Sequence, residues 1–197
     1  MKYSKNWLQE YIVEDLPTDG VIRDALNAKA FEVEGIEFIK YFESVKGDNG
    51  EVSQVEVSDS IFDIKVLPNR AHDALGHLGM AREIASCLDL NIKSESNNNN
   101  ETEFTEINIM GDVGIVDVKV EDSKACTRFI AARVDNIKVG VSEEKIKNKL
   151  ESIGQKSINN IVDITNYVQY AINKPMHAYD AQNIEGGIIV IYANENE

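Results

Sequence analysis

Short polar side chains are concentrated in the stretch 155–180, inside a segment whose apolar residues recur at helical spacing. A protein buries amides and carboxylates only where partners satisfy their hydrogen bonds. The pattern therefore predicts one amphipathic helix with a hydrogen-bonding surface, ended by Pro175 and followed by a histidine. The polar residues are Asn159, Asn160, Asp163, Thr165, Asn166 and His177.

The same residues also suit a purely structural role. Asn159, Asn160 and Asn166 can serve as caps and turn formers, because their side chains bond readily to nearby backbone groups. His177, placed just after a Pro-Met pair, can be a half-buried histidine that fixes the exit of the helix. The residues alone leave both readings open.

Three motifs carry a resemblance to a known family. NNIVDITNYV (159–168), with PMHAYD (175–180) after it, resembles the signature of the third module of the β subunit of bacterial phenylalanyl-tRNA synthetase. The opening MKYSKNWLQEYI is similar to the start of that subunit. VLPNRAHDALGHLGMAREIAS (66–86) resembles the segment that returns to its first module. The three stand in the family's order and cover most of the chain.

The resemblance implies an editing site, which in that family hydrolyses tyrosine wrongly attached to tRNA. His177 matches the pocket histidine, Asn166 lies beside it on the signature helix, and Lys156 takes the position of a basic residue that is usually arginine. Such a histidine could position a water or polarise an ester, and the cation could hold the RNA terminus. Lysine in place of arginine loses bidentate geometry.

The resemblance also implies partners and cofactors. The family works as a heterotetramer of two α and two β subunits that charges tRNA-Phe, and the α subunit handles ATP, Mg²⁺ and phenylalanine. The sequence has no glycine-rich phosphate loop or Walker lysine, so we expect this chain to bind no cofactor itself. Most bacterial relatives insert a tRNA-binding OB-fold after the first strand, whereas residues 41–60 leave room only for a hairpin. We therefore expect a variant lacking that insertion. Because a strand is predicted to begin only a few residues before the last one, we also expect the chain to be an N-terminal fragment of a longer polypeptide.

The sequence is compatible with two functions. In the first, the chain is part of the β subunit of phenylalanine–tRNA ligase, supporting charging by the α subunit and contributing to editing of mischarged Tyr-tRNA. In the second, it is a noncatalytic scaffold or binding module that keeps the fold without editing activity. His177 and the intact helix motif favour the first function, whereas Lys156 and the missing insertion favour the second.

Composition excludes several classes. A net charge of −14 and a pI near 4.6 argue against a protein that binds phosphate backbones over a broad surface. Cys87 and Cys126 form no CxxC pair, which predicts neither a zinc site nor a disulfide framework. No apolar run reaches membrane-spanning length, so we expect no membrane partner and a cytoplasmic location.

The first part of the chain, residues 1–93, is expected to form a small helix and sheet domain. Ser4 predicts the N-cap of a helix that buries Trp7, and Asn49-Gly50 predicts the turn of a hairpin. Asp73 is expected to cap a long helix, from which His72, His77, Arg70 and Arg82 project on the polar side or in the preceding turn. Asn69 and Arg70 could fix a subunit contact, or they could satisfy the turn and a nearby carboxylate, and we favour the structural role. Neither histidine has a third ligand for a metal.

Residues 94–106 are polar and low in complexity, as in a linker, and 107–197 are expected to form the truncated start of a β-rich editing (B3/B4-type) domain. Strands are predicted at 116–120, 127–139 and 188–192. Ser142 predicts a helix start and Gly154 its left-handed end. The fold class is α+β.

Overall fold

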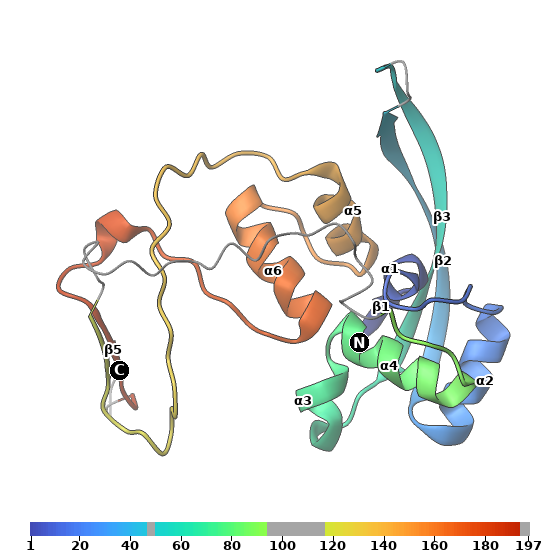
Figure 1. Cartoon of the computed structure of the whole chain (residues 1–197), viewed down its shortest axis with the longest axis horizontal. Helices are drawn as coiled ribbons and strands as arrows, with labels where there is room; N and C mark the ends of the chain where they lie inside the picture. The colour runs from blue at the N-terminus through green and yellow to red at the C-terminus, as the bar shows by residue number, and fades with distance from the viewer. Residues whose placement is uncertain (47–49, 94–116, 194–197) are drawn as a thin grey trace. The chain divides into compact units, whose positions relative to one another are not determined.

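The structure, a computed structural model, describes residues 1–46, 50–93 and 117–193. Its contacts divide the chain into two units (Figure 1). Unit 1 combines Met1–Asn99 with Val139–His177, and unit 2 combines Asn100–Lys138 with Ala178–Glu197. The α+β class is confirmed. The predicted linker 94–106 lies outside the described residues. The two units do not coincide with the predicted domains on either side of this linker, because residues 139–177 pack with the N-terminal part.

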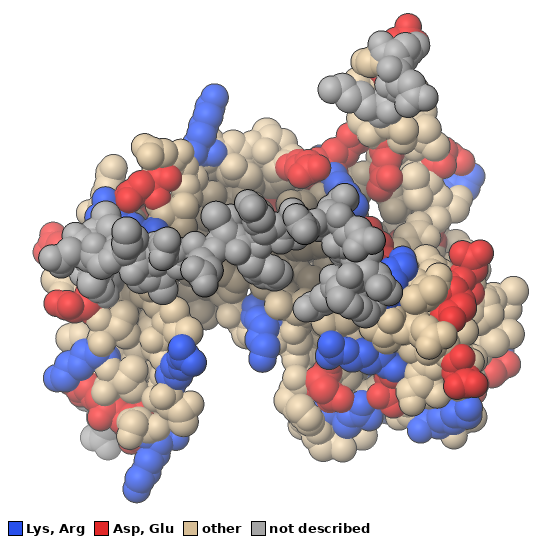
Figure 2. Space-filling view, in the orientation of Figure 1, with Lys and Arg blue, Asp and Glu red and all other residues tan. Residues whose placement is uncertain are grey.

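A long antiparallel hairpin dominates unit 1. Strands β2 (Glu32–Lys46) and β3 (Val52–Lys65) pair along their whole length, and β1 (Lys2–Ser4) adds to the other edge of β3. The predicted hairpin is confirmed; most of its turn, 47–49, lies outside the described residues. Only the base of the hairpin reaches the core, and its far end rises beyond the helices (Figure 1). Acidic side chains are visible along it in Figure 2.

Two helices lie between β1 and β2 in the sequence. The Ser4 hydroxyl accepts the Trp7 amide at 3.0 Å and caps α1 (Lys5–Gln9), as predicted. Helix α2 (Asp19–Lys29) begins at Asp19, whose negative charge is favourable at the positive end of the helix dipole. Both helices bury apolar residues against the sheet. The buried residues of the two helices are Trp7, Leu8, Ile22 and Leu26.

The segment after β3 differs from its prediction. It forms a short 3-10 turn (Pro68–Arg70), α3 (Ala71–Ala74) and α4 (His77–Leu88), so Asp73 lies inside α3 and does not cap α4. A Cβ on Gly79 would lie 1.7 Å from the Asp73 carbonyl oxygen, and this close approach is possible only because residue 79 is glycine. Asp73 instead pairs with Arg70, as expected for the arginine.

Helices α5 (Glu144–Ser152) and α6 (Asn160–Ile172) complete unit 1. Gly154 has φ +82° and ends α5 as predicted, whereas the predicted start at Ser142 is wrong because its hydroxyl bonds to Asp163 instead. Asn173 ends α6 in the left-handed conformation, two residues before Pro175. The predicted apolar face of α6 is only partly buried.

The described residues of unit 2, 117–138 and 178–193, contain little regular structure. Strands β4 (Val118–Val120) and β5 (Ile188–Val190) pair in parallel, near the predicted positions, and a 3-10 turn covers Ala181–Asn183. The strand predicted at 127–139 is wrong, since those residues have no strand assignment. An alternating apolar pattern becomes a strand only when a neighbouring strand pairs with it, and none pairs with 127–139 among the described residues.

Candidate functional site

The loop before α6 is fixed by one buried carboxylate. Asp163 is fully buried and accepts hydrogen bonds from the Ser142 hydroxyl, from the Ser157 hydroxyl at 2.6 Å and from the Ile158 amide at 2.9 Å. Desolvation alone would raise its pKa, but these donors outweigh it and hold the pKa below the usual value. Asp163 therefore acts as an internal anchor that shapes the loop 155–159.

Asparagines complete this anchor. The Asn159 side chain accepts the amides of Ile161 and Val162 at 3.1 and 3.0 Å and caps α6. The Asn160 side chain accepts the Gly140 amide at 3.0 Å, and the Gly140 carbonyl accepts the Asn160 amide in return. Of the polar residues singled out in the sequence, Asn159 therefore caps α6, and Asn160 hydrogen-bonds the start of α6 to the backbone of Gly140.

Helix α6 is joined to the N-terminal segment through His77. This histidine, predicted on the polar side or in the turn, is fully buried: the prediction was wrong. Its ring stacks on Trp7 at 3.9 Å between centroids, and Trp7 stacks in turn on Tyr167 of α6 at 5.1 Å. This stack was not predicted from the sequence, because its three rings come from segments that are far apart in the chain.

The hydrogen bonds of His77 define its protonation. Nδ1 lies 2.8 Å from the Tyr170 carbonyl oxygen, which can only accept, so Nδ1 carries the proton. Nε2 then accepts the Ser4 amide at 3.2 Å. Desolvation lowers the pKa of His77 to about 3, so the ring is neutral near pH 7. A neutral His77 therefore hydrogen-bonds at the same time to the Ser4 amide of β1 and to the Tyr170 carbonyl of α6.

The three predicted site residues lie on α6 and on the segments before and after it. Asn166 is half-buried on α6, Lys156 is exposed in the loop anchored by Asp163, and His177 is exposed after the end of α6. All three belong to unit 1. Their roles in a site stay a prediction.

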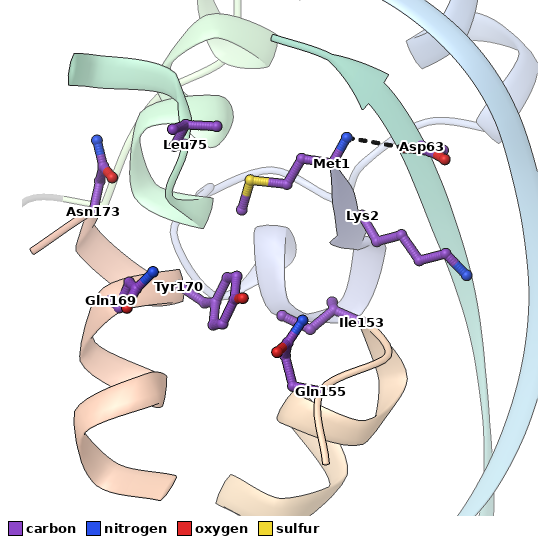
Figure 3. A pocket seen from close by; sticks show the side chains of 9 residues that line it. All are labelled: Met1, Lys2, Asp63, Leu75, Ile153, Gln155, Gln169, Tyr170 and Asn173. Carbon is purple, nitrogen blue, oxygen red and sulfur yellow. Dashed lines mark hydrogen bonds and ion pairs between the residues drawn. The ribbon is translucent and has the colours of Figure 1, made fainter. Parts of the chain in front are cut away.

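A pocket of about 500 Å³ lies nearby in unit 1, and none of the three residues lines it (Figure 3). Gln155 and Gln169 line it from the loop and from α6, with Tyr170 between them. Its charged residues are already paired: Lys2 with Glu37 at 2.8 Å, and Asp63 with the Met1 ammonium group at 2.9 Å. Its full lining is Met1, Lys2, Asp63, Leu75, Ile153, Gln155, Gln169, Tyr170 and Asn173.

The chemistry of this pocket is that of a binding surface. Amide side chains can donate and accept hydrogen bonds, and the lining presents no cysteine, serine or histidine as a nucleophile or base. Because its charges are paired, the pocket suits an uncharged polar group better than a phosphate. Sequence reasoning gave no signal for Gln155 or Gln169, since their convergence depends on the packing of α5 against α6.

Within residues 1–46, 50–93 and 117–193, no group of three or more His, Cys, Asp or Glu side chains could hold a metal ion. In the same part of the chain, no helix is both long and apolar enough to cross a bilayer.

Comparison with known proteins gives consistent matches. A family model described as B3/4 domain matches residues 125–197. The chain is 38% identical over 143 residues to the phenylalanine–tRNA ligase β subunit of Fusobacterium nucleatum, covering 73% of this chain and 17% of that protein. The β subunit of Rhodopirellula baltica is 36% identical over 155 residues, covering 78% of this chain and 22% of that protein.

A third relative agrees with these two. The phenylalanine–tRNA ligase β subunit of Bdellovibrio bacteriovorus is 40% identical over 136 residues, which is 68% of this chain and 16% of that protein. The matched regions thus span about a fifth or less of these relatives. The chain belongs to the family of phenylalanine–tRNA ligase β subunits and corresponds to a part of them.

Proposed function

We propose that this chain works as part of the β subunit of phenylalanine–tRNA ligase. In that role it supports ATP-dependent charging of tRNA-Phe by a catalytic α subunit and contributes to hydrolysis of mischarged Tyr-tRNA. The observation that carries the proposal is the 36–40% identity to several β subunits over about 70% of the chain, together with the B3/4 match. ATP and Mg²⁺ belong to the α subunit in an assembly of two α and two β subunits.

The editing role is assigned to His177, Asn166 and Lys156. His177 is exposed, so a substrate as large as tRNA could reach it, and an imidazole can orient a water toward an ester. Lys156 stands in a loop whose next two residues, Ser157 and Ile158, donate hydrogen bonds to Asp163. This anchoring of the backbone would keep the flexible lysine side chain near one position. Asn166 on α6 would supply a hydrogen bond to the substrate.

Tyrosine release tests this assignment. The natural-length protein, assembled with the α subunit of the same organism, is given Tyr-tRNA-Phe, and free tyrosine is measured over time. We expect His177→Ala to slow release by about 10²-fold or more, the usual scale for a general acid or base. His72→Ala is the matched control, because His72 is an exposed histidine on a different helix.

A second variant tests the cation. Lys156→Arg should speed tyrosine release if Lys156 holds a phosphate, because the guanidinium gives bidentate hydrogen bonds that an ammonium cannot give. Unchanged release with both His177→Ala and Lys156→Arg would remove these residues from the site.

A noncatalytic scaffold is the second candidate. It is favoured by the observation that the three residues do not line the neutral pocket beside them. A scaffold would bind the α subunit and support charging without releasing tyrosine. The tyrosine assay therefore separates the two functions.

A further inference from the structure

Helix α6 is fixed to the N-terminal part of unit 1 at three points. The Tyr167 ring stacks on Trp7 at 5.1 Å between centroids. One turn later, the Tyr170 carbonyl oxygen accepts the Nδ1 proton of His77 at 2.8 Å. At the end of the helix, the Asn173 side chain donates to a backbone carbonyl of α3 at 2.7 Å. The three positions follow at steps of three residues and so lie along one side of α6.

Asn166 lies on the same side of α6. It precedes Tyr170 by four residues and Asn173 by seven, and residues at these spacings lie one above the other on a helix. It is also the direct neighbour of Tyr167. The side of α6 that contacts the N-terminal part therefore carries a proposed editing residue. A rotation of α6 away from these contacts would displace Asn166.

The same N-terminal segment also holds α5, through Glu10 at the end of α1. The Glu10 carboxylate pairs with Lys149 and, at 3.5 Å, with Lys145. The Lys149 side chain is only 11% exposed, and its ammonium group lies 5.3 Å from the ring centres of both Trp7 and Tyr167. An ammonium group shielded from water by two aromatic rings and a carboxylate is bound more firmly than one in an exposed ion pair.

The loop between α5 and α6 is thus fixed from both ends. This loop, residues 153–159, contains Lys156, and Asp163 holds its second half through Ser157 and Ile158. Because α5 and α6 both rest on α1, the contacts of α1 determine where Lys156 and Asn166 stand relative to each other.

Trp7 is the residue on which these contacts converge. It is fully buried, and its ring meets His77 of α4, Lys149 of α5 and Tyr167 of α6. We infer that Trp7 is a positioning residue of the proposed editing site, acting through α5 and α6 on Lys156 and Asn166. The inference rests on the proposed function. A catalytic group displaced by about 1 Å can lose about 10²-fold in rate, so Trp7 can govern the reaction without touching the substrate.

The test measures tyrosine release and phenylalanine charging on one preparation of the natural-length protein, assembled with the α subunit of the same organism. Trp7→Leu removes the stack. At saturating Tyr-tRNA-Phe it should lower kcat for tyrosine release at least about tenfold, while KM changes less than about threefold and charging less than about twofold. Trp7→Phe keeps an aromatic ring on Tyr167 and should restore most of the release rate.

A matched control separates positioning from stability. Leu26→Ala also removes a fully buried apolar side chain, but from α2 in the main core. It should change tyrosine release less than about twofold at a temperature where far-UV circular dichroism shows every variant folded. Tyr167→Leu removes the same stack at a half-buried position and should slow release as Trp7→Leu does, so it carries the test if Trp7→Leu does not fold.

The other outcomes are distinguishable. Tyrosine release and charging that fall together in Trp7→Leu, or release that falls as much in Leu26→Ala, overturn the inference, because Trp7 would then only stabilise the fold. Undiminished release by folded Trp7→Leu or Tyr167→Leu overturns it as well. In these cases the unmodified protein still releases tyrosine and the proposed function stands. An unmodified assembly that charges tRNA-Phe but releases no tyrosine overturns the proposed editing role and this inference together.

Discussion

Replacing His77 by phenylalanine tests the junction between the N-terminal segment and α6. Phenylalanine keeps a ring beside Trp7 but leaves the Tyr170 carbonyl and the Ser4 amide without their partner. A buried polar group without a partner costs about 1 to 3 kcal/mol, so two such groups should cost about 2 to 6 kcal/mol at pH 7. This is a large part of the stability of a typical domain, about 5 to 15 kcal/mol.

The pH dependence sharpens this prediction. The pKa of His77 is near 6.5 in the unfolded chain and lowered to about 3 in the folded one, so only the unfolded chain takes up the proton between these values. The unmodified protein should therefore lose about 1.4 kcal/mol for each pH unit below 6.5 through this residue. Because the variant lacks that loss, the difference in unfolding free energy between the two proteins should narrow by about 2 kcal/mol between pH 6.5 and 4.5.

Urea unfolding at several pH values measures this difference. Trp7, the single tryptophan, stacks on residue 77 and gives a local fluorescence signal beside the global signal from circular dichroism. His72→Phe is the control, because His72 is exposed, and it should change stability by less than about 0.5 kcal/mol. A stability difference for His77→Phe that stays constant with pH would refute a neutral, buried His77.

Two further predictions concern single positions in unit 1. Gly79→Ala should destabilise by about 2 kcal/mol or more in urea unfolding, because its Cβ would collide with the Asp73 carbonyl, whereas Gly20→Ala has open space in α2 and should be neutral or stabilising by about 0.5 kcal/mol. Asp163→Ala should cost about 2 to 4 kcal/mol because the Ser142 hydroxyl and the Ile158 amide lose their acceptor. Since the pKa of Asp163 is lowered on folding, its contribution should be complete above the ordinary value of 3.8 and disappear as the pH falls through the folded value.

Local signals in the sequence were sufficient for much of the first unit. The Ser4 cap needs only a hydroxyl three residues before Trp7, and the hairpin needs only two strand patterns around a turn. Both predictions are confirmed. The end of α5 also follows from Gly154, which adopts the left-handed conformation. The end of α6 at Asn173, also left-handed, was not predicted, because Pro175 was expected to end that helix.

The predictions for Ser142 and His77 were wrong because the partners of these residues are distant in the sequence. Ser142 stands before two glutamates like an N-cap, but the buried carboxylate of Asp163, 21 residues later, takes its hydroxyl. His77 looked like a surface residue because a single sequence does not reveal that Trp7 and Tyr170 surround it. For the site, His177, Asn166 and Lys156 came from the resemblance, and their roles stay predictions.

The most direct test of the β-subunit assignment is a charging assay. The natural-length protein is co-expressed with the α subunit of the same organism, purified by a tag on this chain alone, and supplied with ATP, Mg²⁺, phenylalanine and tRNA-Phe. We predict that the α subunit co-purifies and that the joint preparation charges tRNA-Phe, whereas α alone does not. An α subunit that is folded, does not co-purify and charges tRNA-Phe without this chain would contradict the assignment.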